Sequence, residues 1–436
     1  MYTPLKKALY GLKQSPKNWN ETLREFMNSH DFYDTEFAPG LFVSSDGNKR
    51  IAAYVDDCVL AADTEEDLDE IIEMFKNTFE IKAIVIMNEE KQLETDILGI
   101  DLKYDLNKGI ITLSMKSYID KFNNDFPLLK LKEYENNLTT EQKKDLTPHF
   151  SEYNLNPNED TLLMNKTEYK EKVKYIQKSI GMPNYLRTRG RLDLEFAVSK
   201  IARFAFYAHA KVIKAVDRLI KYTYVKRDLN VVIKREKKQP DEITVITDAS
   251  LGSEYDVKSR IGGIIWFGNT FMFGFFKKKS SIVCDSSAEC ELDALNKGEK
   301  LTLHLKFKLE KLFKKNFKIN IITDSKPVLE WLKKTYIGGR TKFLGIRIGR
   351  LKERLKDKSN FLRKIDGLEN VADPLTKQVS STDFKNLSKI MEGNITPQNL
   401  LPLTNLVETE EEFARCKDRV CSGRMIKSLL RGCAGI

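Results

Sequence analysis

The sequence predicts a protein of mixed α+β and α/β class with three parts. In the N-terminal part, "IAAYVDDCVLAAD" (residues 51–63) alternates in the way typical of two short strands joined by a tight turn. The middle part, residues 167–226, repeats apolar residues at helical spacing. From residue 243 to residue 378 strand and helix patterns alternate, and that mixture indicates an α/β domain.

The N-terminal part, residues 1–128, contains several elements in order. A helix is expected near "SPKNWNETLREFMNSH", and the turn "SSDGNKR" leads from it to the hairpin. A second helix follows, because apolar residues recur on one of its faces: Leu68, Ile71, Ile72, Phe75 and Phe79. Residues 93–115 read as two strands with a turn at Asn107–Gly109.

Four further segments complete the predicted domain organisation. Residues 129–166 are polar and rich in Asn and Glu, as in an insertion or linker, and residues 167–236 are helical. The charged stretch "KREKKQPDE" (234–242) is the expected hinge before the α/β domain at 241–380. That domain reads as three strands, a helix, a strand, a helix, a strand and a short helix, and residues 381–436 form a peripheral, partly disordered tail.

The composition favours a soluble intracellular protein with a polyanionic partner. Lys and Arg number 73 against 63 Asp and Glu, a formal net charge of +10. The 6 cysteines form no CxxC pair and the 4 histidines are scattered, which argues against a zinc site or a disulfide framework. No apolar run approaches the ~18 residues that a membrane span needs, and the N-terminus lacks the apolar region of a secretory signal.

Asp56 and Asp57 are adjacent in the predicted turn of the hairpin. Two like charges repel, so such a pair persists when water or a metal cation takes up the charge. The pair is therefore a candidate metal site, and an ordinary β-turn is the alternative.

Four more acids, Asp248, Glu289, Asp324 and Asp373, lie at the ends of predicted elements in the α/β domain. Two of the predicted strands end in "TDAS" and "TDS", Glu289 lies at the start of a helix that Ser286 or Ser287 would cap, and Asp373 opens a short helix before Pro374. Strand ends and helix starts are where an α/β sheet displays functional groups. Each acid taken alone could be a turn former, a helix cap or a solvated side chain.

Taken together, these acids predict a divalent-cation site. Carboxylates without nearby histidine or cysteine favour hard cations such as Mg²⁺. Two such ions about 3.5–4 Å apart can activate a water and stabilise the leaving oxygen in an attack on phosphate.

The local words around these acids resemble the ribonuclease H domain of copia-type LTR retrotransposons. They read "TDAS" (247–250), "SSAECE" (286–291), "TDS" (323–325) and "NVADPLTK" (370–377). The likeness is greatest to the yeast Ty elements, and among these to the fourth Ty family. It implies a mixed sheet flanked by helices, and a two-metal enzyme that cuts the RNA strand of an RNA–DNA hybrid. Asp248, Glu289, Asp324 and Asp373 would be its Mg²⁺ ligands, with Mn²⁺ as a substitute.

The resemblance continues upstream into a reverse transcriptase palm and a helical thumb or connection region. "LKKALYGLKQSPKNW" (5–19) is similar to the segment under the incoming nucleotide and template, which implies nucleotide or template binding by Gly11, Gln14, Ser15 and Pro16. "YVDD" (54–57) resembles the polymerase signature, with Asp56 and Asp57 as metal ligands, and residues 180–204 resemble the part that closes on the duplex.

Two departures from the family limit what the resemblance implies. The third polymerase carboxylate lies upstream of "LYGLKQSP" in the family, so this chain alone is not expected to polymerise DNA. Many ribonucleases H also carry a histidine shortly before the last Asp, and no histidine follows His304 here. The alternative to an active nuclease is a catalytically inactive, truncated protein that acts, if at all, by binding nucleic acid or by interference.

The resemblance also implies partners and a location. The partners would be an RNA–DNA hybrid, the element's RNA and other Gag and Pol products, with oligomers inside virus-like particles and no membrane. The expected location is cytoplasmic, within such particles, or nuclear.

Overall fold

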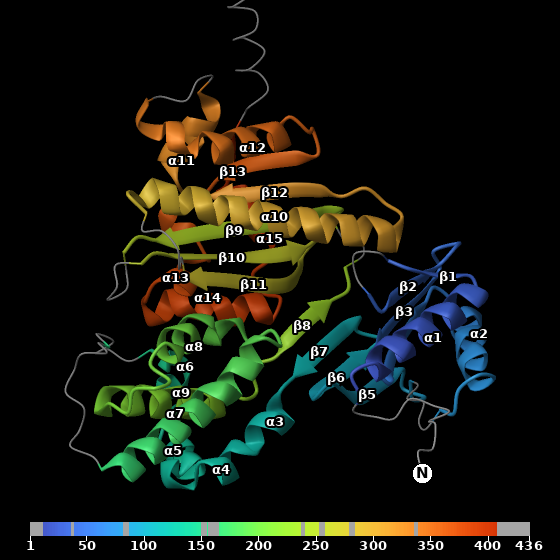
Figure 1. Cartoon of the computed structure of the whole chain (residues 1–436), viewed down its shortest axis with the longest axis horizontal. Helices are drawn as coiled ribbons and strands as arrows, with labels where there is room; N and C mark the ends of the chain where they lie inside the picture. The colour runs from blue at the N-terminus through green and yellow to red at the C-terminus, as the bar shows by residue number, and fades with distance from the viewer. Residues whose placement is uncertain are drawn as a thin grey trace, which may run out of the picture. The chain divides into compact units, whose positions relative to one another are not determined.

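The computed structural model describes residues 12–35, 39–81, 87–149, 155, 165–236, 240–252, 258–278, 284–334 and 339–407. The chain divides into two compact units (Figure 1). The first comprises Met1–Leu93 with Leu303–Phe317, and the second comprises Glu94–Thr302 with Lys318–Ile436. Among the helices in the described ranges, none combines the length and the apolar character of a membrane span.

The first unit contains an antiparallel sheet of order β1-β2-β3-β4 and two helices. Its elements are α1 (Ser15–Ser29), β1 (Phe32–Asp34), β2 (Leu41–Ser44), β3 (Lys49–Tyr54), β4 (Asp57–Ala62) and α2 (Glu65–Lys76). Phe26 of α1 packs edge-on against Phe75 of α2, with ring centroids 5.3 Å apart, over the buried Ile51 of the sheet. The predicted first helix, hairpin and amphipathic second helix are confirmed.

A second four-stranded sheet has the order β5-β6-β7-β8. Its strands are β5 (Gln92–Ile97), β6 (Ile100–Asp105), β7 (Ile110–Ser114) and β8 (Val231–Lys234). The turn predicted at Asn107–Gly109 is present, but residues 93–105 form two strands where the sequence predicts one. Leu98 and Gly99 both adopt positive φ, 55° and 73°, and this tight turn divides the predicted strand.

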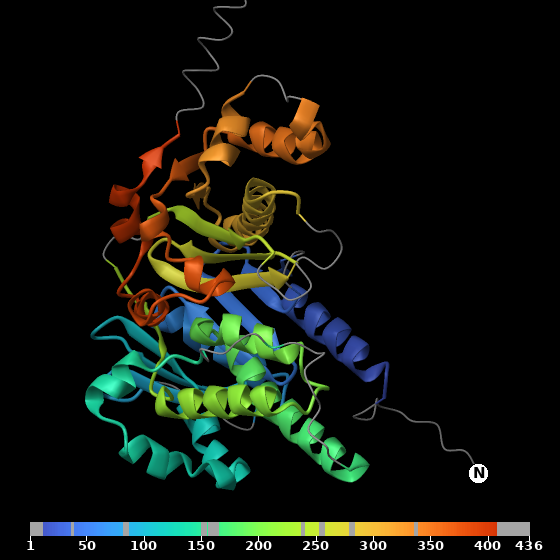
Figure 2. The ribbon, with the colours of Figure 1, turned by 90° about the vertical axis from the view of Figure 1, so that its left-hand side faces the viewer.

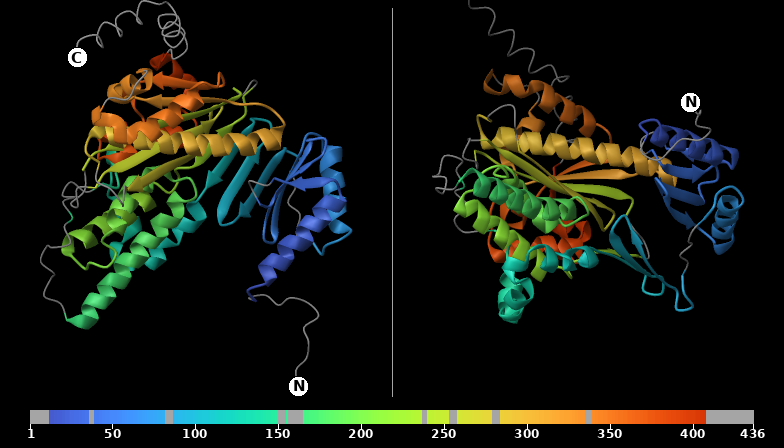
Figure 3. Two further views of the ribbon diagram at one scale, coloured as in Figure 1. Left: turned by 45° about the horizontal axis from the view of Figure 1, so that its top comes forward. Right: turned by 60° about the horizontal axis from the view of Figure 1, so that its bottom comes forward.

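The middle of the second unit is helical. The helices are α3 (Lys116–Asp120), α4 (Phe122–Asp125), α5 (Leu131–Asn136), α6 (Thr140–Asp145), α7 (Lys166–Arg187), α8 (Glu195–Ala202) and α9 (Ala210–Val225). Helices α7 and α9 lie side by side (Figure 3). Ile176 and Ile180 of α7 and Ala197 and Ile201 of α8 are buried, as their helical spacing predicts.

The C-terminal part contains a six-stranded mixed sheet of order β11-β10-β9-β12-β13-β14. Its strands are β9 (Glu242–Ser250), β10 (Arg260–Phe267), β11 (Thr270–Lys278), β12 (Lys318–Thr323), β13 (Asn360–Lys364) and β14 (Asn405–Leu406). The pairs β9–β12 and β12–β13 are parallel, whereas β9–β10, β10–β11 and β13–β14 are antiparallel. The predicted mixed sheet and α/β class are confirmed.

Helices cover both faces of this sheet (Figures 1 and 2). They are α10 (Ser287–Phe313), α11 (Lys326–Lys333), α12 (Gly345–Leu355), α13 (Asp373–Thr376), α14 (Ser381–Met391) and α15 (Pro397–Leu400). A Cβ on Gly298 would lie 2.8 Å from Thr247 Cγ2, so glycine lets α10 approach β9 closely. Two helices, α11 and α12, connect β12 to β13, where the sequence predicts one.

The predicted hinge at 234–242 does not separate the helical part from the α/β part. Both parts contribute to one hydrophobic core inside the second unit. The Leu192 N–H donates to Met391 Sδ at 3.2 Å, and the Tyr222 and Phe384 rings lie 6.1 Å apart. A local charge run marks an exposed segment, but long-range apolar packing decides where a domain ends.

Two segments are more ordered than the sequence predicts. Described residues of the expected linker at 129–166 form α5 and α6, and Leu131 is buried in the core cluster. In the expected tail at 381–436, α14 buries Phe384 and Ile390, and β14 pairs with β13. Residues 408–436 lie outside the described ranges. Short helices with few apolar positions carry a weak periodic signal, and for this reason both segments read as irregular.

Candidate metal centre

The register of β9 and β12 brings Asp248 and Asp324 together. The two strands are parallel neighbours, with Ile246 opposite Ile322. Each aspartate follows that pair by two residues, and side chains along a strand return to the same face every two residues. The two carboxylates therefore leave neighbouring strands at the same point and on the same face.

Helix α13 adds Asp373 to this pair. Asp373 is its first residue and precedes Pro374, as predicted. One ligating oxygen from each of Asp248, Asp324 and Asp373 lies within 4.8 Å of the other two. The Thr376 hydroxyl of the same helix donates a hydrogen bond to Asp248 Oδ2 and fixes its orientation.

Glu289, the predicted fourth member, is not in this group, and the glutamate of α10 that lies beside the three aspartates is Glu291. Oε1 of Glu291 accepts a hydrogen bond from the N–H of Ala249, the residue after Asp248, at 3.3 Å. Two residues correspond to about 200° of rotation around an α-helix, so Glu289 and Glu291 face opposite directions. We call Asp248, Glu291, Asp324 and Asp373 the acid cluster.

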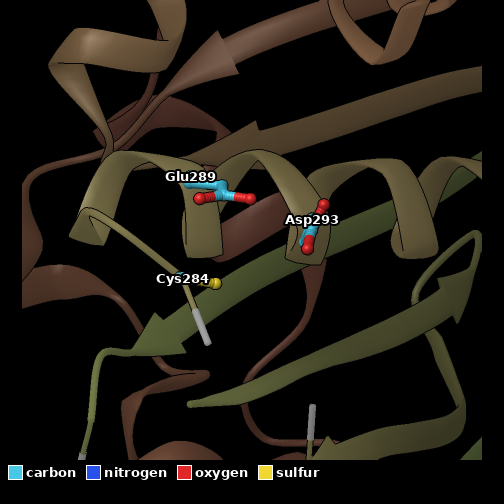
Figure 4. Close-up of side chains that lie close together, drawn as sticks. All are labelled: Cys284, Glu289 and Asp293. Carbon is cyan, nitrogen blue, oxygen red and sulfur yellow. The ribbon is translucent and has the colours of Figure 1, made fainter. Parts of the chain in front are cut away.

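Glu289 belongs to a separate group, in which one possible ligand atom from each of Cys284, Glu289 and Asp293 lies within 4.8 Å of the other two (Figure 4). Arg347 Nη1 lies 3.2 Å from Glu289 Oε1 and 2.8 Å from Asp293 Oδ1. The other oxygen of Glu289 accepts from the Asp285 N–H at 3.1 Å. Its backbone N–H donates to Ser286 Oγ at 3.2 Å, which confirms the predicted serine cap. Because the Arg347 guanidinium is shared by both carboxylates, this network ties α10 to α12.

The packing side of α10 carries the signal that identifies Glu291. Gly298 packs against β9, and Glu291 precedes it by seven residues, which is two helical turns. Leu295 is fully buried and lies on the same stripe, four residues after Glu291. The acid that shares a face with these residues is the one that reaches the strand ends.

Convergence and burial raise the pKa values of the acid cluster. Burial, with the charge of Asp373, raises the pKa of Asp248 to about 8. Burial, with the charges of Asp248 and Asp324, raises the pKa of Glu291 to about 9. The pKa of Asp324 is also raised, mainly by burial. Carboxyl groups with raised pKa values in such a cluster are stabilised in their ionised form by a bound cation.

Two buried oxygen atoms of the cluster fit a cation ligand. Glu291 Oε2 and Asp373 Oδ1 have no hydrogen-bond partner among the described residues. Buried acceptors without a partner are costly, and carboxylate oxygens are the ligands that Mg²⁺ prefers. The donor set therefore fits a hard divalent cation.

The hairpin acids occupy a different environment in the first unit. Tyr54 is paired with Asp57 across β3 and β4, so Val55 and Asp56 form a two-residue turn with Val55 at φ 55°. Asp56 and Asp57 are both exposed. Within the described ranges, no group of three side chains that could hold a metal includes either of them.

The predicted nucleotide- or template-binding residues lie at the start of α1. Gln14 precedes the first residue of α1, Ser15, and Pro16 follows it, whereas Gly11 lies outside the described residues. One turn further along α1, Trp19 Nε1 donates to the Val55 carbonyl oxygen at 2.8 Å. That hydrogen bond joins the motif-bearing helix to the hairpin tip.

Comparison with known proteins gives a match to one protein family and to yeast transposon proteins. Residues 2–138 match the family "Reverse transcriptase (RNA-dependent DNA polymerase)". The transposon TyH3 Gag-Pol polyprotein of Saccharomyces cerevisiae is 28% identical over 387 residues, 88% of this chain and 21% of that protein. The truncated transposon Ty1-A Gag-Pol polyprotein of the same yeast is 29% identical over 387 residues, 88% of this chain and 31% of that protein.

Two solved structures are also similar. RNase H1 from the archaeon Halobacterium salinarum matches at 16% identity and TM-score 0.25, over 31% of this chain and 94% of that one. The N-terminal RNase H domain of a Mycobacterium tuberculosis protein matches at 13% identity and TM-score 0.23, over 34% and 96%. The chain spans between a fifth and a third of the length of the yeast relatives. The predicted resemblance to yeast Ty elements is confirmed: the chain is similar to the Gag-Pol polyproteins of yeast Ty transposons over 88% of its length.

Proposed function

We propose that the C-terminal α/β part of this chain is a ribonuclease that cleaves the RNA strand of an RNA–DNA hybrid. The approach of Asp248, Asp324 and Asp373 to within 4.8 Å of one another, with Glu291 held beside them by the Ala249 N–H, supports this proposal. Four carboxylates from four separate elements, two of them with buried oxygens that have no partner in the described part of the chain, make a donor set suited to phosphodiester hydrolysis.

The cofactor of this reaction is Mg²⁺, with Mn²⁺ as a substitute. When bound, two such ions supply an activated water and stabilise the leaving oxygen. The chain's own groups hold the ligands in place, since Thr376 orients Asp248 and the Ala249 N–H fixes one oxygen of Glu291. The oxygens of Glu291 and Asp373 that lack a hydrogen-bond partner are then available to a cation.

Exposed lysines of α7 support binding of a polyanionic substrate. Lys166, Lys170, Lys174 and Lys178 follow one another at four-residue spacing and are all exposed. Residues four apart share a helix face, so these four form a basic stripe, with Lys178 also paired to Asp125 at 2.8 Å. Contacts from such a stripe to phosphates would make hybrid binding depend on salt.

Cleavage of an end-labelled RNA–DNA hybrid by the full chain in Mg²⁺ tests the proposal. We expect cleavage of the RNA strand, no cleavage of the DNA strand, and a loss of about 10³-fold in the Asp324→Asn variant because it removes a ligand. Asp57→Asn, an exposed acid of the hairpin, is the matched control and should cleave like wild type. Absence of cleavage by wild type over a full Mg²⁺ and Mn²⁺ range would refute the proposal.

The match to the reverse transcriptase family favours a second function, RNA-directed DNA synthesis. Asp56 and Asp57 would supply two of the metal ligands, and a third carboxylate from a further strand is needed. Strand β4, which begins at Asp57, is at the edge of its sheet and has β3 as its neighbour in the described residues. We infer that this chain without an added strand does not extend a primer on an RNA template. Robust extension by the purified chain would contradict this inference.

The Gag-Pol names of the relatives favour other products of the same element as partners. We infer assembly with such products and with the element's RNA, in cytoplasmic virus-like particles or in the nucleus. Co-sedimentation of the tagged chain with particle RNA would test this, and a chain found only in the free fraction would argue against it.

A further inference from the structure

A lysine ammonium lies against the acid cluster. Lys377 follows the last residue of α13, and its Nζ lies 2.8 Å from Asp373 Oδ2. Its backbone N–H also donates to the Asp373 carbonyl oxygen at 3.1 Å, so the side chain starts from a fixed point. The side chain is 45% exposed, which leaves the ammonium open to solvent on the side away from Asp373.

The charge of Lys377 acts on the whole cluster. It opposes the rise in the pKa of Asp248, Glu291 and Asp324. Conversely, burial lowers the pKa of Lys377, and the carboxylates of Asp248, Asp373 and Asp324 more than offset this, so that its pKa is raised. The contact of 2.8 Å between Lys377 Nζ and Asp373 Oδ2 therefore places a positive charge beside the acid cluster.

Such a charge becomes surplus when divalent cations bind. With two divalent cations bound, the four ionised carboxylates, the ammonium and the cations together carry an excess of one positive charge. A phosphodiester carries one negative charge, so the lysine and the substrate phosphate then complement each other. The flexible four-carbon stem of lysine permits a change of partner without movement of the backbone.

We propose that Lys377 is a positioning residue with two partners, the carboxylate of Asp373 before divalent cations bind and a phosphate oxygen of the hybrid afterwards. Only the second of these contacts, the one with a phosphate oxygen, rests on the proposed nuclease function. The first half of the proposal is the contact with Asp373, where the ammonium and a divalent cation compete for the same carboxylates. The second half is the contact with phosphate.

Mg²⁺ binding to the full chain, measured by calorimetry and by thermal unfolding in EDTA and in Mg²⁺, tests the first half. In Lys377→Met we expect a lower Tm in EDTA and about threefold to tenfold tighter Mg²⁺ binding, because a competing charge is removed. Lys377→Arg keeps the charge and should retain the wild-type affinity. The matched control is Lys356→Met, which removes an exposed ion pair to Glu353 and should change neither quantity.

Steady-state cleavage of the hybrid tests the second half. Lys377→Met should raise KM about tenfold with a smaller fall in kcat, because it removes an interaction with phosphate that is made in both the ground state and the transition state. Lys377→Arg should recover most of the KM. Unchanged or weaker Mg²⁺ binding in Lys377→Met overturns the competition, and an unchanged KM overturns the interaction with phosphate. Failure of wild type to cleave refutes the nuclease function instead, while the Mg²⁺ affinities still decide the first half.

Discussion

The two carboxylate regions of this molecule differ in how many chain segments build them. The hairpin places Asp56 in its two-residue turn and Asp57 at the start of β4, and both side chains are exposed. The acid cluster draws its four members from β9, α10, the end of β12 and the start of α13, with Asp248 buried and Glu291 half-buried. Local sequence suffices for the first arrangement, whereas the second requires a folded sheet with helices on both faces.

This difference has a chemical consequence. Adjacent carboxylates that are exposed are solvated and need no counter-ion, so a metal ion would stabilise the hairpin acids only slightly. Convergent buried carboxylates repel one another and lose hydration, and for this reason the pKa values of Asp248 and Glu291 rise to about 8 and about 9. A cation relieves both costs, so the acid cluster is the stronger candidate for a metal site.

The largest expected effect separates the two glutamates of α10. Glu291→Gln should reduce hybrid cleavage about 10³-fold, since it removes a charged ligand oxygen from the cluster. Glu289→Gln, two residues away and facing Arg347, should keep cleavage within about threefold of wild type because its partners lie outside the cluster. Rates of RNA cleavage at saturating Mg²⁺ measure both effects.

The Tm of each variant distinguishes the loss of a ligand from a folding defect. Glu289 is buried and paired with the half-buried Arg347, so its substitution should lower the Tm, whereas Glu291→Gln should leave or raise the Tm in EDTA by relieving repulsion. A reversed result, with full activity in Glu291→Gln and loss in a folded Glu289→Gln, would return the metal site to the sequence-based assignment.

The elements of this fold could largely be predicted from the sequence. The hairpin, the amphipathic α2 and the alternation of β9 to α13 carry strong periodic or turn signals. The boundaries between domains could not, because they depend on long-range packing. Leu131 and Phe384 lie in segments that read as linker and tail, yet both are buried in the core of the second unit.

The candidate site could be predicted for three of its four acids. Asp248, Asp324 and Asp373 lie at strand ends or at a helix start, which are the positions where an α/β sheet presents functional side chains. The fourth depends on the rotation of α10, and an error of two residues reverses the direction of the side chain. Lys377 ends the motif "NVADPLTK", but the sequence alone does not indicate a role for it. Its ion pair with Asp373 becomes evident only from the structure.

The next largest effect is the pH dependence of stability without metal. The folded pKa values of Asp248 and Glu291, about 8 and about 9, exceed the values near 4 that such groups have in an unfolded chain. The folded state therefore binds more protons, and its stability falls as pH rises through this range, by up to about 1.4 kcal/mol per pH unit for each group.

Thermal unfolding in EDTA between pH 5 and pH 9 measures this dependence. We expect the Tm to fall by several degrees toward pH 9, and saturating Mg²⁺ to remove most of the fall because the cation stabilises the ionised cluster. Asp248→Asn should flatten the metal-free curve, and Asp57→Asn should not. A metal-free Tm that is constant or rises with pH would remove the proposed contrast between the two regions.

The smallest expected effect concerns binding of the hybrid to the basic stripe on α7, away from both acid regions. Lys170→Gln combined with Lys174→Gln shortens the basic stripe on α7, so the hybrid should bind a few-fold more weakly, with a log–log salt slope shallower by about 0.9 for each phosphate that the stripe no longer neutralises. The control pair, Lys356→Gln with Lys358→Gln, changes the same charge on exposed positions elsewhere. Fluorescence anisotropy in an Asp324→Asn background, which prevents cleavage, measures the affinities. Equal slopes for the two double variants would show that the stripe is a solvated helix face, and that the hybrid is held by other groups.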